Sequence, residues 1–184
     1  MYYSWFKSLS GTLPRSLSQL NNIKTLQLQC NYFIGSLNGI IDPKNQIYLQ
    51  NFDISDNSFT GSLPVELFDL PSIQTIAAVK NCFSGYLPDN ICKPKTLNVL
   101  ALDGLTSSPK CISYIASFLN GYISSPMKGT IPTCLYSLPN ITTLHMSGNS
   151  FSGSISNIQM ESLSPFLDDL TLSFNRYSHV LGVL

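Results

Sequence analysis

Apolar residues alternate with polar ones in short segments that recur along the whole chain. In each segment two apolar residues lie two positions apart, and an Asn usually follows three residues after the second, as in Leu26, Leu28 and Asn31. Alternation with a period of two is typical of a β-strand that buries one face. We therefore expect one short strand in each segment. The apolar pairs that predict these strands are Leu26/Leu28, Phe52/Ile54, Ile76/Ala78, Leu100/Leu102, Leu144/Met146 and Leu170/Leu172.

A Gly-x-Leu or Gly-x-Ile motif, often followed by Pro, accompanies these segments at a nearly fixed period. Successive motif glycines are 24, 26, 24, 44 and 24 residues apart, and they are Gly11, Gly35, Gly61, Gly85, Gly129 and Gly153. A repeat of this length cannot bury its apolar face alone, so neighbouring copies must stack into a solenoid. Glycine tolerates a backbone conformation that a Cβ atom opposes, and the Pro fixes φ where the return segment begins.

The Asn that follows each predicted strand is expected to form a structural ladder. Its carboxamide carries two donor hydrogens and an acceptor, so stacked copies can satisfy backbone groups of the turns between coils. An aromatic residue two positions later predicts a stack of rings inside the solenoid. The ladder residues are Asn31, Asn57, Asn81, Asn149 and Asn175.

The 44-residue spacing marks an interruption of the repeat. The strand of that unit is intact, but Leu105 occupies the Asn position and an extra segment follows, at about 107–127. We expect one repeat domain over 1–184, with about six to seven repeats of 24–26 residues, this insertion, and no terminal caps.

Composition and charge narrow the classes of function. The chain has 10 Lys plus Arg and 10 Asp plus Glu, so it lacks the basic excess that nucleic-acid binding requires. Only 11% of its residues are charged. It contains 27 Ser and 15 Asn, so uncharged polar groups must provide much of its solubility. Neither a signal peptide nor a membrane-spanning apolar run is present in the sequence.

The unit L-x-x-L-x-L-x-x-N-x-F-x-G-x-[IL]-P resembles the plant-type leucine-rich repeat of receptor-like kinases, receptor-like proteins and polygalacturonase inhibitors. The resemblance covers about 10–178 and implies an α/β solenoid. This would be a right-handed horseshoe with a short parallel sheet on its concave side and an irregular or 3₁₀ convex side. It also implies a protein or peptide ligand, a co-receptor among the partners, and an extracellular or cell-surface location. The capping segments of the family are absent here, so we interpret the chain as a piece of a longer protein; a complete chain would instead be cytoplasmic.

Two columns of side chains are expected to point outward from the concave sheet and to bind a partner. Most are small or polar, and Ala77, Val79 and Ala101 form an apolar window beside Asp103 and His145. The alternative is a solvated sheet whose small residues accommodate curvature. The first column is Gln27, Asp53, Ala77, Ala101, His145 and Thr171, and the second is Gln29, Ser55, Val79, Asp103, Ser147 and Ser173.

The insertion has two interpretations, and its cysteines two pairings. By resemblance it could fold back and bind ligand, or it could pack against the flank of the solenoid to bury its apolar residues. A disulfide from Cys111 to Cys134, or from Cys92 to Cys111, would fasten it. Cys30 and Cys82 are expected to be free or packed thiols. Asn140-Ile-Thr142 is the one standard N-glycosylation sequon.

Catalysis is not expected, and neither is a metal or cofactor. His145 is the one plausible base on the sheet, and its neighbours within its column are Ala101 and Thr171, which are not acidic. Asp103 lies one unit away in the second column, and a lone His/Asp pair on an open face is typical of a surface contact. No phosphate-binding loop, nucleophile elbow or zinc motif is present.

The favoured function is therefore a non-catalytic recognition module of a receptor-like or secreted protein. Two alternatives remain. The chain could belong to the ectodomain of a receptor kinase whose catalytic domain lies outside it, or it could bind ice or polysaccharide through aligned Ser and Thr residues, of which only Ser55, Ser147 and Ser173 align.

Overall fold

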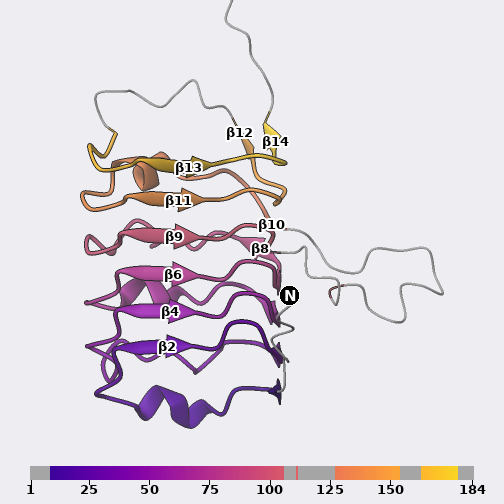
Figure 1. The fold of residues 1–184 in the computed structure, drawn as a ribbon, viewed down its shortest axis with the longest axis vertical. Helices are drawn as coiled ribbons and strands as arrows, with labels where there is room; N and C mark the ends of the chain where they lie inside the picture. Colours follow the sequence, from indigo (N-terminus) through magenta and orange to yellow (C-terminus); the bar gives the residue numbers. More distant parts are fainter. Residues whose placement is uncertain (1–8, 106–110, 112–126, 154–162, 178–184) are drawn as a thin grey trace, which may run out of the picture.

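The computed structural model describes residues 9–105, 111, 127–153 and 163–177, which form a solenoid of stacked coils (Figure 1). Each coil contributes one strand to a six-stranded parallel sheet with the spatial order β13-β11-β9-β6-β4-β2. The expected repeat solenoid with a parallel sheet and little helix is confirmed. The six strands are β2 Thr25–Gln27, β4 Asn51–Asp53, β6 Thr75–Ala77, β9 Val99–Ala101, β11 Thr143–His145 and β13 Asp169–Thr171.

A second series of short parallel strands runs along the flank where the coils turn away from the main sheet (Figure 1). Four of these strands form one sheet, in the order β1-β3-β5-β7, and the others pair as β8 with β10 and β12 with β14. They are β1 Ser10–Gly11, β3 Tyr32–Gly35, β5 Ser58–Gly61, β7 Cys82–Phe83, β8 Gly85–Tyr86, β10 Met127–Lys128, β12 Ser152–Gly153 and β14 Arg176–Tyr177.

The return segments contain short 3₁₀ helices that follow the Pro of the glycine motif. Pro14, Pro64 and Pro132 each stand immediately before such a helix with extended backbone. The pyrrolidine ring presets φ, and its missing N–H is not needed at a helix start. The helices are η1 Arg15–Gln19, η2 Val65–Asp69 and η4 Thr133–Ser137.

The apolar residue at the centre of each concave strand from β2 to β11 points into the core, whereas Leu170 of β13 is exposed. Phe52, Ile76, Leu100 and Leu144 are completely buried and lie in register across β4, β6, β9 and β11. The expected ring stack is present where Phe33 and Phe59 lie 6.1 Å apart in a stacked arrangement. After the interruption, Met127 is buried two residues before Gly129, where four other units have Phe33, Phe59, Phe83 and Phe151. An unbranched thioether fills such a gap readily.

The Asn ladder forms through a recurring set of hydrogen bonds. Asn81 Nδ2 donates to the carbonyls of Ile54, Ala78 and Val79, and its Oδ1 accepts from the amide of Phe59. These bonds span two coils and leave the buried carboxamide satisfied, which matters because burying an unpaired polar group is costly. The same acceptor bond to the preceding coil is made by Asn31, Asn57, Asn149 and Asn175.

The residue before each ladder position adopts a left-handed backbone. Cys30, Asp56, Lys80 and Phe174 have φ between 53° and 59°, and Gly104 and Gly148 stand at the equivalent places. This conformation lets the chain leave the concave strand and present the Asn toward the coil interior. It is unfavourable for residues with a Cβ atom, so the four non-glycine positions carry backbone strain.

Two disulfides fasten the coils on either side of the interruption. They join Cys82 to Cys111 and Cys92 to Cys134, with Cα atoms 5.2 Å and 6.0 Å apart. Both pairings predicted from the sequence were therefore wrong, and so was the expectation that Cys82 is a thiol. Cys82 lies at the start of β7, buried in the flank, where the spacing in sequence did not place it near Cys111. Cys30 is an exposed free thiol.

The predicted insertion lies almost entirely outside the described residues. Cys111, near its start, and Met127, at its end, are the described positions of this segment.

A candidate partner-binding face

The first predicted column lies in register across the whole concave sheet. Strand pairing aligns Gln27 with Asp53, Asp53 with Ala77, and Ala77 with Ala101. His145 then pairs with Ala101 on one side and Thr171 on the other, as expected from the sequence. Gln27 is exposed and the other members are partly exposed, so the column lies at the surface of the sheet.

The second column continues the same parallel ladder beyond the strand ends. The amides of Cys30, Asp56, Lys80, Gly104 and Gly148 donate to carbonyls of this column in the next coil. Its members therefore also stack coil upon coil at the surface. They are Gln29, Ser55, Val79, Asp103, Ser147 and Ser173.

A third outward column, at the first residue of each strand, was missed by the sequence analysis. Strands of three residues expose their first and third positions on the same face, so this column follows from the period of two. The signal that could have found it is the residue two positions before each member of the first column. The third column is Thr25, Asn51, Thr75, Val99, Thr143 and Asp169.

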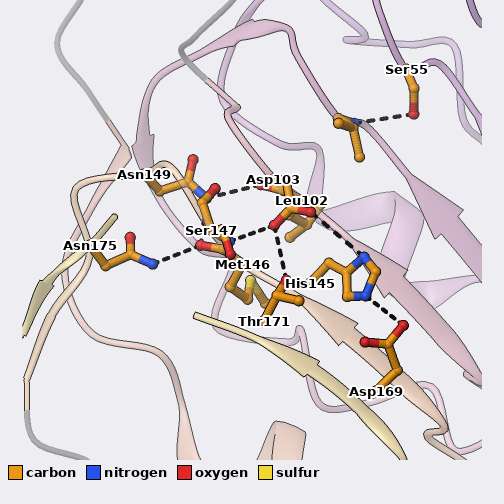
Figure 2. A network of polar contacts seen from close by, with 11 residues as sticks. Ser55, Leu102, Asp103, His145, Met146, Ser147, Asn149, Asp169, Thr171 and Asn175 are labelled. Carbon is orange, nitrogen blue, oxygen red and sulfur yellow. Dashed lines mark hydrogen bonds and ion pairs between the residues drawn. The ribbon is translucent and has the colours of Figure 1, made fainter. Parts of the chain in front are cut away.

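The three columns meet in a polar network around His145 (Figure 2). His145 Nε2 lies 2.8 Å from Asp169 Oδ2, and His145 Nδ1 lies 3.6 Å from Asp103 Oδ2. The other oxygen of Asp103 accepts a hydrogen bond from the amide of Ser147 and lies 3.4 Å from the Thr171 hydroxyl. The predicted contact between His145 and Asp103 is therefore present, but Asp169 is the nearer partner.

This arrangement favours recognition over nucleophilic chemistry. Each ring nitrogen of His145 faces a carboxylate, whereas a general base needs one nitrogen facing the proton that it removes. Among the described residues, no group of three or more His, Cys, Asp or Glu side chains could hold a metal ion.

The concave face is acidic although the whole chain is neutral. Its three columns contain Asp53, Asp103 and Asp169 and contain neither Lys nor Arg. The Asp53 carboxylate accepts from the amide of Ser55, which fixes its orientation. A partner that presents cations to this face would gain electrostatic complementarity.

The apolar window predicted from the sequence is a continuous patch. Ala77 and Ala101 are neighbours in register, and the amides of Ala78 and Lys80 donate to the carbonyls of Ala101 and Asp103 in the next coil. Val99, at the start of β9, extends the patch into the third column. All four apolar side chains are partly exposed, so a partner's apolar group can contact them.

The sequon directly precedes Thr143, the member of the third column in β11. Asn140 is exposed just before β11, where its Nδ2 donates to the carbonyl of Lys95 at 2.7 Å. Thr142 donates its hydroxyl to the carbonyl of Asn98. The sequon therefore follows η4, at the edge where the concave strands begin.

Comparison with known proteins agrees with this architecture. The Leucine Rich Repeat family model matches residues 48–70 and 140–159. Receptor-like protein 39 of Arabidopsis thaliana is 31% identical over 189 residues, which covers 88% of this chain and 21% of that protein. The chain is a plant-type leucine-rich repeat protein. It spans about a fifth of the length of this curated relative.

Solved receptor ectodomains share the fold. The chain is 27% identical, with a TM-score of 0.71, to the ectodomain of the Arabidopsis thaliana receptor kinase GASSHO1/SCHENGEN3 in complex with CASPARIAN STRIP INTEGRITY FACTOR 2, covering 91% of this chain and 17% of that one. It is 26% identical, with a TM-score of 0.69, to the Arabidopsis receptor kinase HAESA in complex with the peptide hormone IDA and the co-receptor SERK1, covering 91% and 24%. Among the described residues, no helix has the length and apolar character needed to cross a membrane.

Proposed function

We propose that this chain is a non-catalytic recognition module of a cell-surface or secreted receptor-like protein, and that its concave face binds a protein or peptide. The observation that carries the proposal is the unbroken alignment of three outward columns over six coils. Such a surface offers an extended partner a long series of equivalent contacts.

The chemistry of the columns favours a partner with an extended segment. The window at Ala77, Val79 and Ala101 can take an apolar side chain. The polar network begins at Asp103, in the same coil as Ala101, and reaches Asp169 two coils further along the solenoid. Apolar contact at a centre with polar groups around it is the usual anatomy of a protein interface. Related ectodomains that bind peptide hormones support a peptide as the partner.

An extracellular location fits the cysteine chemistry. Four of the five cysteines form two disulfides, and such bonds persist in oxidising compartments. The similarity to plant receptor-like proteins supports the same location.

The proposal is tested by selecting peptides from a displayed random dodecamer library on the immobilised chain. The selected peptides are then measured against Ala101→Trp, which places an indole in the middle of the window. We expect the variant to bind at least about tenfold more weakly, because the ring fills the space that the partner's anchor needs.

Val65→Trp is the matched control, because Val65 is 49% exposed on η2, away from the concave sheet. Equal binding by both variants, or no peptide recovered above background, would overturn the proposal.

A further inference from the structure

The ring of His145 is placed between two carboxylates from different coils. A neutral imidazole has one N–H donor and one lone pair, so it can donate to only one carboxylate. Its lone pair then faces the other carboxylate, at Asp169 Oδ2 (2.8 Å from Nε2) or Asp103 Oδ2 (3.6 Å from Nδ1). An imidazolium ion has an N–H on both nitrogens. The observed geometry therefore suits the protonated ring.

We propose that His145 is a proton-dependent clasp across the coils of β9, β11 and β13, and that this clasp regulates partner binding at the concave face. The regulatory part rests on the function proposed above. The clasp itself does not, because it concerns contacts within the chain.

The charged groups that face the ring come from both neighbouring coils and are all acidic among the described residues. Asp103 follows β9 and Asp169 begins β13. The register neighbours of His145, Ala101 and Thr171, carry no charge. On its own strand segment, Thr143 and Ser147 are also neutral. The described charged groups around the ring are thus two carboxylates and no cation.

The clasp lies at the position where the repeat is interrupted. The junction between β9 and β11 is the one that spans the 44-residue spacing, and Asn149 connects it through the carbonyl of Leu102 and the amide of Leu105. Asp103 connects this junction twice, through His145 and through the amide of Ser147. The clasp therefore adds a contact between side chains to a junction that the ladder already connects.

The sign of the pH effect follows from the geometry. Only a ring with an N–H on both nitrogens can donate to both carboxylates. Imidazoles in general change charge between about pH 5 and 8, so the two forms of the clasp are compared across that range. At the same time, protonation of His145 changes the net charge of the three columns from −3, the sum of Asp53, Asp103 and Asp169, to −2. It also engages carboxylate oxygens that a cationic group of a partner would otherwise use.

The clasp is tested by thermal unfolding of the wild-type chain and His145→Gln at about pH 5 and about pH 8. We expect the stability lost by the variant to be larger at the lower pH by about 1–4 °C in Tm, the scale of partly exposed ion pairs in a domain of this size. Asp169→Asn should remove most of that difference. A loss that is equal at both pH values would overturn the clasp.

Regulation is tested with the library-selected peptides that contain Lys or Arg and no His. We expect them to bind the wild-type chain about two- to fivefold more tightly at pH 8 than at pH 5, and to bind His145→Gln equally at both. The same pH dependence in both proteins would overturn the regulation while leaving the recognition function intact. If the library yields no peptide, the recognition function and its regulation both fail, and the unfolding experiment alone decides on the clasp.

Discussion

The amide of Phe83 donates to the backbone carbonyl of Leu105 at 2.8 Å. In neighbouring coils the equivalent amide donates to the side-chain oxygen of a ladder Asn, as Phe59 does to Asn81. The amide of Leu105 in turn donates to Asn149 Oδ1. The backbone of Leu105 thus supplies the acceptor and the donor that keep the ladder connected through the interruption. The apolar side chain is fully buried there.

Replacing a ladder Asn in the middle of the solenoid should be strongly destabilising. Asn81→Ala removes an acceptor and up to three donor contacts at a site with no exposed surface. Leaving buried backbone groups unpaired predicts a loss of roughly 2–4 kcal/mol in the free energy of unfolding. Urea unfolding followed by circular dichroism measures it.

Asn31→Ala is the matched control at the partly exposed end of the ladder. Its loss should be clearly smaller, because water can reach the groups that the carboxamide leaves. Equal losses at both positions would mean that burial does not determine the strength of the ladder.

The disulfide pairing can be read directly by mass spectrometry of the unreduced chain. Trypsin with Asp-N separates Cys82 from Cys92, because Asp89 lies between them, and cleavage after Lys110 separates both from Cys111. We expect the peptide of Cys82 to be linked to that of Cys111, and the peptide of Cys92 to that of Cys134. A link between Cys92 and Cys111, or between Cys111 and Cys134, would contradict the structure.

Reduction should also lower stability. The two bridges close loops with sequence separations of 29 and 42 residues, and each is worth about 3–4 kcal/mol in the chain-entropy model. Thermal unfolding with and without a thiol reductant measures the effect. The exposed Cys30 thiol is blocked beforehand so that it cannot exchange.

The parts of the structure that depend on the repeat period could be predicted from the sequence. Leu26 and its equivalents fix the strands, and their register brings Ala77 beside Ala101. The fold and two of the outward columns follow from this pattern alone. Asp169 was missed because the position at the start of each strand was not considered, although the same period of two predicts it.

The disulfides could not be predicted, because they depend on how the chain crosses the interruption. Cys82 lies on the flank and Cys92 on the return segment, so the two belong to different sides of the coil. The repeat pattern gives no position to Cys111, which falls within the insertion. Spacing in sequence therefore favoured the wrong partners.

The left-handed residue before each ladder position predicts opposite effects for two substitutions. Gly148→Ala introduces a Cβ atom with 3.6 Å to its nearest contact, so only the positive φ of 68° opposes it. Cys30→Gly relieves the same strain at φ 59°. We expect the first to lower and the second to raise the free energy of unfolding, each by up to about 1 kcal/mol.

Chemical denaturation of both variants checks this pair of effects. Cys30→Ser, which keeps a Cβ atom and removes the thiol, is the control for loss of the sulfur. If Cys30→Ser gained as much stability as Cys30→Gly, the backbone conformation would not be the cause.

A convex contact between coils should weaken as the pH falls. The hydrogen bond from Lys93, at 2.7 Å, and then that from Asn90 lower the pKa of Asp69 below its ordinary value. A carboxyl whose pKa is lower in the folded state stabilises the fold at neutral pH and loses that contribution as the pH falls toward the folded-state pKa.

Because Asp69 and Lys93 are both partly exposed, Asp69→Asn should cost only about 0.2–1 kcal/mol at pH 7. The cost should shrink at about pH 3. Unfolding experiments at the two pH values measure this, with Asp89→Asn, at an exposed neighbour, as the matched control.

Asn140 is expected to carry a glycan when the chain passes through a secretory pathway. The residue is exposed, and its amide uses one hydrogen for the bond to the Lys95 carbonyl, so the single N–H left after glycan attachment can keep that bond. Attachment forms a bond from Nδ2 to the anomeric carbon of the sugar, while the sugar leaves its lipid pyrophosphate carrier and Nδ2 loses a proton.

We expect one glycan on the secreted chain, seen as a mass that an endoglycosidase removes. Thr142→Ala should abolish it, because the sequon needs a hydroxyl two residues after the Asn. Thr143→Ala changes the adjacent residue and should retain it. A secreted chain without that mass, or one that keeps it in Thr142→Ala, would contradict the assignment.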